Sequence, residues 1–193
     1  ADVRWKGRVC IRSSSNIYNQ SMVAALIEQY GEASVQTWAN QFVTNFARKP
    51  KGGDRDQIKA LVAGECDVAI ANTYYLAGMA ASNDETTTKI AAQVKVLWPD
   101  QKGKGTHVNI SGAAIAKYSK NVKAAQALIE FMLTPKAQQW YARENQEYPI
   151  VADVPWSPIL QSYGQFQGQN IALDKVGERN AQALKLMDRA GWK

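Results

Sequence analysis

Apolar and polar positions follow one another along the first half of the chain in a pattern that predicts strands and helices in turn. Short apolar runs typical of buried strands occur at residues 8–12, 67–71 and 94–98. Helical signals occupy the segments between them, at residues 16–30, 35–46, 54–62, 76–81 and 87–94. We expect Asp54 to cap the helix at 54–62. This order predicts an α/β fold with a mainly parallel sheet flanked by helices.

The second half of the chain starts with a connector rich in glycine and lysine at residues 101–107. An apolar run then predicts a strand at residues 108–116, and helical patterns follow at residues 124–133, 136–145 and 180–192. Residues 146–176 have few periodic runs and are expected to be rich in loops. We therefore divide the chain into an α/β unit at residues 1–104 and a second unit at residues 105–193.

The charge of the chain is positive but dispersed. It has 23 Lys and Arg against 17 Asp and Glu, a net charge of +6. The basic residues form no stripe the size of a nucleic-acid groove, so we expect no nucleic-acid partner. No apolar stretch reaches the ~20 residues of a membrane span, and from the absence of a charged-then-apolar start we expect no leader in this sequence. Because the chain begins at Ala1 without a methionine, we interpret it as a processed protein or a piece of a longer one.

The two cysteines, Cys10 and Cys66, are too few for a cysteine-based zinc site. Each lies at or just before a predicted strand. If those strands are neighbours in a parallel sheet, a disulfide between them is possible. Two buried free thiols are an equally good interpretation of the sequence.

Unusual polar residues follow two of the predicted strands. The sequence RSSSNIY follows the first strand, and NTYY follows the strand at 67–71. Ligands of open α/β sheets bind at the carboxyl ends of the strands. If the two strands are adjacent, one pocket gathers three phenols, one guanidinium and several hydroxyl and amide groups, from Tyr18, Tyr74, Tyr75, Arg12, Ser13, Ser14, Ser15, Asn16 and Asn72.

Three phenols make a poor acid–base site at neutral pH, because an unperturbed tyrosine has a pKa of ~10. They suit a hard, highly charged cation, which binds the phenolate anion and releases its proton. Ferric iron, Fe3+, is the natural candidate, since three phenolates balance its charge. The alternative is that one tyrosine packs in the core and the other faces solvent. His107, the one histidine, follows a connector, and we assign it to that connector rather than to a metal site.

Enzyme motifs are missing from the sequence. It contains no glycine-rich phosphate loop, no paired-carboxylate signature and no nucleophile elbow. A binding protein is therefore favoured over an enzyme.

Four segments resemble the periplasmic ferric-iron-binding proteins of bacterial ABC importers, most closely the cyanobacterial type. They are RVCIRSSSNIYNQS, WANQFVTNFARKPKGGDRDQIKALVAGECDVAIANTYY, GTHVNISGAAIAKYSKN and LMDRAGWK. The resemblance covers nearly the whole chain. It implies a two-lobed periplasmic binding protein fold of type II, with iron held between the lobes.

The resemblance also implies roles for particular residues. Tyr74 and Tyr75 match the tandem tyrosine ligands of the family, and Tyr18 matches the third tyrosine of the cyanobacterial type. The resemblance further implies an ABC transporter permease as partner and a periplasmic location. Positions near a small synergistic anion, or beside the ligands, fall on Arg12, Ser15, Asn16 and Asn72. The alternative function is a receptor of the same fold for a small anion or another solute.

The chain departs from the family in length. It resembles members from the point where they enter the second lobe, so the N-terminal part of lobe one lacks a counterpart. Residues 105–193 would then be the returning half of that lobe, without the strands on which it normally packs. Exposed apolar edges favour pairing with another chain. We therefore expect a dimer, a missing N-terminal segment or a rearranged C-terminal half.

Overall fold

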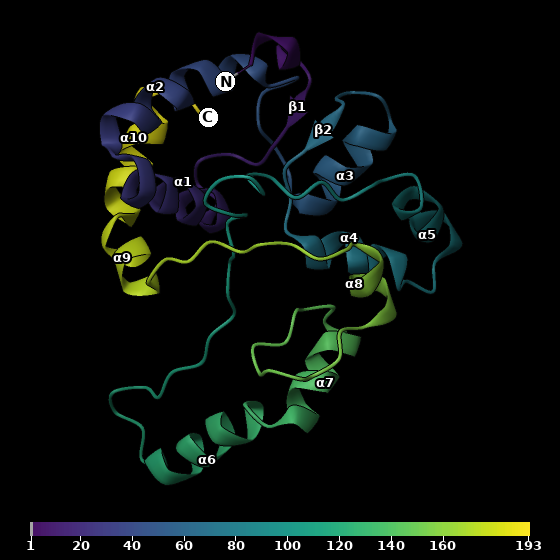
Figure 1. Cartoon of the computed structure of the whole chain (residues 1–193), viewed down its shortest axis with the longest axis vertical. Helices are drawn as coiled ribbons and strands as arrows, with labels where there is room; N and C mark the ends of the chain where they lie inside the picture. Colours follow the sequence, from purple (N-terminus) through teal and green to yellow (C-terminus); the bar gives the residue numbers. More distant parts are fainter. Residues whose placement is uncertain (1) are drawn as a thin grey trace.

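The computed structural model describes residues 2–193, which are mostly helical (Figure 1). Two short strands, β1 (Val9–Cys10) and β2 (Val68–Ala69), form the sheet. The helices in chain order are α1 (Ile17–Tyr30), α2 (Glu32–Phe42), α3 (Asp54–Val62), α4 (Thr73–Ala80), α5 (Glu85–Ala91), α6 (Val122–Met132), α7 (Pro135–Glu144), α8 (Pro158–Ser162), α9 (Leu173–Glu178) and α10 (Asn180–Arg189). Two 3-10 helices span Val3–Trp5 and Val43–Asn45.

The sheet is parallel, as expected, but smaller than the sequence predicts. Val9 pairs with Val68 and Cys10 with Ala69, so the predicted strands at 8–12 and 67–71 are neighbours. The predicted strands at 94–98 and 108–116 are wrong, since neither segment pairs with a strand in residues 2–193. Their apolar side chains have other environments: Val96 packs against the cluster around Leu76, whereas Leu97 is exposed.

A disulfide joins Cys10 of β1 to Cys66, two residues before β2. The Cα atoms of the two cysteines lie 5.8 Å apart, within the usual range for a disulfide. Of the two interpretations that the sequence left open, the structure therefore has the cross-link. It ties together the two strands whose ends carry the polar residues.

The main core lies between α1, α2, α9 and α10 (Figure 1). Its largest member is Trp192, which is fully buried and packs edge-on against Phe42 and Phe46. The Trp192 indole donates a hydrogen bond to the carbonyl of Arg12 at 3.0 Å. Residues 173–192 therefore share a core with α1 and α2, although we placed them in a different unit. The boundary at residue 104 stays a prediction.

A smaller core fixes the position of α4. Ile58 of α3, Leu76 and Met79 of α4 and Ala91 of α5 form this cluster, and Tyr75 packs against it. Asp54 is the first residue of α3 rather than its cap, and the cap position is Gly53. The carboxylate of Asp56 instead accepts a hydrogen bond from the Gly53 amide at 2.7 Å. This leaves the side chain of Asp54 available for other partners.

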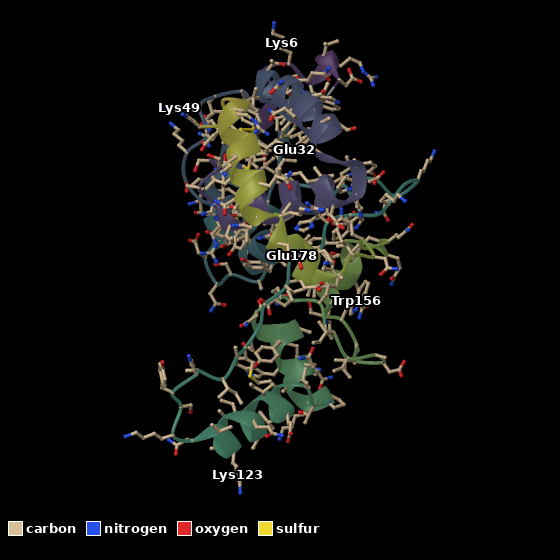
Figure 2. The ribbon with its side chains drawn as sticks, turned by 90° about the vertical axis from the view of Figure 1, so that its left-hand side faces the viewer. Lys6, Glu32, Lys49, Lys123, Trp156 and Glu178 are labelled. Atoms are coloured by element: carbon tan, nitrogen blue, oxygen red, sulfur yellow. A yellow bond between two sulfur atoms is a disulfide. The ribbon has the colours of Figure 1, made fainter. Side chains whose placement is uncertain are left out.

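Helix α6 lies at one end of the molecule, far from the main core, in both views, and α7 lies between it and α8 (Figures 1 and 2). The break between them occurs at Pro135, as predicted, where Thr134 caps α7 through its side chain. No residue of α6 is buried, and the exposed apolar side chains of the α6–α7 hairpin include Val122, Leu128, Phe131 and Trp140. Within residues 2–193, nothing covers this apolar face.

Candidate metal centre

The three tyrosines lie in the first turns of two helices that begin beside the ends of the paired strands. Tyr18 is the second residue of α1, and Tyr74 and Tyr75 are the second and third residues of α4. Asn16 caps α1 by accepting a hydrogen bond from the backbone of Asn19. Tyr74 and Tyr75 are consecutive residues of this first turn, and their rings lie close together in the structure. Helix N-termini also favour negative charge, and hence phenolate.

The hydroxyl groups of the three tyrosines converge. The Tyr74 hydroxyl donates to that of Tyr18 at 2.9 Å, and the Tyr18 and Tyr75 hydroxyls are 3.5 Å apart. The Tyr74 and Tyr75 rings lie with their centroids 4.3 Å apart. The sequence also allowed one tyrosine of the pair to pack in the core and the other to face solvent. The structure differs from that alternative, because the hydroxyls of both Tyr74 and Tyr75 lie beside the Tyr18 hydroxyl.

Two of these phenols, Tyr18 and Tyr74, have raised pKa values and keep their protons. Burial, followed by hydrogen bonds with Tyr18 and Tyr75, raises the pKa of Tyr74. The hydrogen bond from Tyr74 works to lower the pKa of Tyr18, but the contact with Tyr75 and burial outweigh it, so the pKa of Tyr18 is raised. A cation that binds here must therefore displace protons.

Positive groups flank the phenols. The guanidinium of Arg12 lies 5.6 Å from the centroid of the Tyr18 ring, and that of Arg55 lies 5.7 Å from the Tyr75 ring. Arg12 also forms an ion pair with Asp54, with Nη1 and Oδ2 2.6 Å apart. Burial works to lower the pKa of Arg12, but the hydrogen bond and charge of Asp54 outweigh it and raise that pKa.

The remaining predicted polar residues lie nearby but are partly engaged. The hydroxyls of Ser13 and Ser15 are 2.7 Å apart on the surface. Asn16 is buried, and its side chain caps α1. The Asn72 side chain is different, because its amide nitrogen is buried without a hydrogen-bond partner in residues 2–193. The Nε of Arg12 is likewise buried without a hydrogen-bond partner in this part of the chain.

His107 does not join the tyrosines. Its Nε2 lies 3.0 Å from the Ser21 hydroxyl, and its Nδ1 lies 2.9 Å from Oε1 of Gln169. Because Gln169 donates its own amide to Gln29, its oxygen accepts from His107, and Nε2 accepts from Ser21. The histidine thus joins the 101–107 connector to α1 and to the strand-like segment at 168–169.

Acid is expected to destabilise the chain through His107. Burial lowers the pKa of His107 from 6.5, although the bond with Gln169 opposes the shift. Below pH ~6.5 the unfolded chain therefore binds more protons than the folded chain, and the free energy of unfolding falls as pH drops toward the lowered pKa. Urea unfolding at pH 7.5 and 5.5 measures this fall. The variant His107→Gln should show a smaller fall, and an equal fall would contradict the prediction.

Asp54 is the residue of this site that the sequence analysis placed elsewhere. Its side chain is only 3% exposed, and it contacts both strand ends. The sequence did carry one signal for this role. Two acidic residues, Asp54 and Asp56, lie in the first turn of α3, and Asp56 alone already accepts the hydrogen bond from the amide at the cap position, Gly53. Within residues 2–193, no three His, Cys, Asp or Glu side chains cluster in a way that could hold a metal ion. The tyrosine cluster is the candidate metal centre because its three hydroxyls converge.

The parallel strands and the flanking helices form an α/β fold, and solved structures with the type II periplasmic binding protein fold superpose on the chain. The chain belongs to the family of bacterial extracellular solute-binding proteins, which matches residues 1–166.

Two iron uptake proteins of a cyanobacterium match this chain over its whole length. It is 48% identical to iron uptake protein A1 of Synechocystis sp. and 38% identical to iron uptake protein A2 of the same organism. The chain covers 54% and 56% of these two proteins, about half their length.

Solved structures agree in fold. A Trichodesmium protein (IdiA, FutA) in complex with iron and citrate ligands superposes with a TM-score of 0.96 at 45% identity, over 100% of this chain and 61% of that chain. The ferric binding protein of Campylobacter jejuni superposes with a TM-score of 0.95 at 35% identity, over 100% of this chain and 61% of its own. The resemblance to ferric-iron-binding proteins is thereby confirmed.

Proposed function

We propose that this chain binds ferric iron through Tyr18, Tyr74 and Tyr75 and serves as part of the receptor of an ABC iron importer. The observation that carries the proposal is the convergence of the three hydroxyls, at 2.9 and 3.5 Å. The names of the relatives support the choice of iron as the cargo.

The chemistry of the cluster suits Fe3+ as cargo. Phenolate is a hard oxygen donor, and three phenolates neutralise three positive charges. The N-termini of α1 and α4 stabilise the negative charge that develops when the phenols lose their protons. Acid, or reduction to ferrous iron, which phenolate holds less well, releases the cargo.

The proposed partner is the permease of an ABC transporter, and the proposed location is the periplasm. The disulfide between Cys10 and Cys66 supports an oxidising compartment. None of the helices in residues 2–193 has the length and apolar character that crossing a membrane requires. A dimer, or an additional N-terminal segment against the second unit, stays a prediction, supported by the exposed apolar face of α6.

The test is a titration of the purified chain with chelated ferric iron, followed by visible absorption. We expect a phenolate-to-iron charge-transfer band that saturates at one iron per chain. A chain that stays colourless while the chelator releases no iron would contradict the proposal.

Iron binding is expected to weaken in acid. Because Tyr18 and Tyr74 hold their protons in the metal-free chain, loading must release at least these two. Affinity should then fall about a hundredfold for each pH unit, about tenfold for each proton released. A pH indicator in weak buffer counts the protons set free per iron. Release of fewer than two would show that the two tyrosines do not both bind as phenolates.

A small anion is the second candidate cargo. The unpartnered, buried nitrogens of Arg12 and Asn72 favour it, because both are donors to oxyanions. Equilibrium dialysis against sulfate or phosphate without metal tests this function directly. Binding of the anion without any iron-dependent colour would favour the second candidate.

A further inference from the structure

Two connectors cross where Thr106 pairs with Gly168. One connector leads from α5 to α6, and the other returns from α8 to α9 (Figure 1). Thr106 donates its amide to the carbonyl of Gln167 at 2.8 Å, and its own carbonyl accepts from the amide of Gln169 at 2.8 Å. A Cβ added to Gly105 would lie 2.7 Å from the carbonyl oxygen of Gly168, so the two backbones are in direct contact.

His107 joins this crossing to α1. Its Nδ1 donates to Oε1 of Gln169 at 2.9 Å, and its Nε2 accepts from the hydroxyl of Ser21 at 3.0 Å. Nε2 of Gln169 then donates to Oε1 of Gln29, which also lies on α1, at 3.0 Å. Ser21 follows Tyr18 by three residues on the same side of α1. The imidazole therefore links both connectors to the helix that carries Tyr18.

This network fits the neutral form of His107. A neutral imidazole has one donor and one acceptor nitrogen, and the network uses one of each. A proton added to Nε2 would reverse the hydrogen bond with Ser21 and would place a positive charge in a partly buried site. Burial lowers the pKa of His107, and the hydrogen bond with Gln169 opposes this shift.

No carboxylate in residues 2–193 forms a hydrogen bond or an ion pair with His107. The titratable side chains of α1 and of the nearby connectors are Tyr18, Glu28, Tyr30, Asp100, Lys102 and Lys104. Glu28 pairs with Arg179 at 2.8 Å, and Tyr30 donates to Asp100 at 3.1 Å. Tyr18 accepts from Tyr74, and the two lysines are exposed. A charge on the imidazole would therefore lack an opposite charge beside it.

We propose that His107 is a proton-sensitive link, which fixes the crossing of the connectors to α1 when neutral and releases it when protonated. Release removes a support of α1 one turn beyond Tyr18. Acid then weakens iron binding through the fold, in addition to the competition of protons for the phenols. The effect on iron rests on the proposed function, whereas the link itself does not.

The first measurement is amide hydrogen exchange at Thr106 and Gln169 in the metal-free chain, at pH 7.5 and 5.5. The variant His107→Asn is the reference at each pH, because its amide takes up no proton and the intrinsic pH dependence of exchange cancels. We expect exchange in the parent to rise relative to this variant by about three- to tenfold in acid, since the open form binds one proton with a pKa of ~6.5. Equal exchange of the two chains at both pH values would overturn the inference.

A second variant, Gln169→Glu, should reverse the sign of the effect. A carboxylate that accepts from Nδ1 stabilises the protonated imidazole, so it raises the pKa of His107 in the closed form above that in the open form. Exchange at Thr106 should then fall relative to His107→Asn as the pH drops. Gln167→Glu is the matched control, because it adds the same charge to an exposed side chain of the same connector, and it should behave like the parent. Opening of the Gln169→Glu chain in acid, to the same extent as the parent, would contradict the link.

The second measurement is competition for iron with a ferric chelator at the same two pH values. Proton competition at the phenols is common to the parent and His107→Asn, so it cancels in the comparison. We expect acid to cost the parent more affinity than the variant, by up to about tenfold. Equal losses would overturn the coupling between His107 and the tyrosine site. If no chain binds iron, the proposed function fails, and the exchange experiment still decides whether His107 is a proton-sensitive link.

Discussion

Replacing both Tyr74 and Tyr75 by phenylalanine is expected to abolish ferric iron binding and to leave the fold intact. The rings remain to pack together and against the cluster around Leu76, so little apolar burial is lost. Two of the three phenolate donors disappear. Because loss of a single residue that only supports a metal ligand already costs about 10–100-fold in affinity, loss of two direct ligands should cost more than about a hundredfold.

The measurement is the charge-transfer band and the competition of each chain with a ferric chelator. A matched control replaces two other tyrosines, Tyr30 and Tyr118, by phenylalanine, since both side chains are exposed and lie outside α4. Circular dichroism confirms that each variant is folded. If the Tyr74→Phe, Tyr75→Phe chain retains the band and the affinity of its parent, then the convergence of the hydroxyls has no role in iron binding.

Removal of the disulfide should cause the largest loss of stability. Cys10 and Cys66 are 56 residues apart in the sequence, and the cross-link restricts the unfolded chain over this whole length. The entropy of closing a loop of that size corresponds to about 4 kcal/mol of folding free energy. The variant with both cysteines replaced by alanine should therefore unfold at a much lower urea concentration than the parent.

Reductant provides the control for this experiment. The parent in dithiothreitol should approach the stability of the double alanine variant, and the variant should not respond to dithiothreitol. Since both cysteines are buried, the alanines also leave a small space, and the reduced parent separates that effect from the loss of the cross-link. A difference between the oxidised parent and the variant below about 1 kcal/mol would contradict the prediction.

Helices were predicted more accurately than strands. The segment predicted at residues 16–30 forms α1 (Ile17–Tyr30), because a capping asparagine and a terminal glycine mark its ends in the sequence itself. The strands predicted at 94–98 and 108–116 do not form. An apolar run indicates that burial of a segment is favourable. A strand forms only where a neighbouring strand supplies the backbone hydrogen bonds. That neighbour lies far away in the sequence and leaves no local signal.

The same distinction applies to the site. Tyr18, Tyr74 and Tyr75 were predicted to meet on the condition that their strands are adjacent, and the register of Val9 with Val68 meets that condition. Asp54 was predicted to cap α3, because a helix start explains an acidic residue without reference to the rest of the fold. Its actual partners are 42 and 18 residues away in the sequence.

By itself, the sequence determined the α/β class, most of the helices, the type of donor at the site and the resemblance to ferric-iron-binding proteins. These features depend on local periodicity, on the chemistry of individual side chains and on motifs that are contiguous in the chain. Only the tertiary structure decided that Cys10 and Cys66 are cross-linked, that the C-terminal Trp192 packs beside α2, and that Asp54 pairs with Arg12. Each of these depends on which distant segments lie together, and packing of the whole chain selects those contacts.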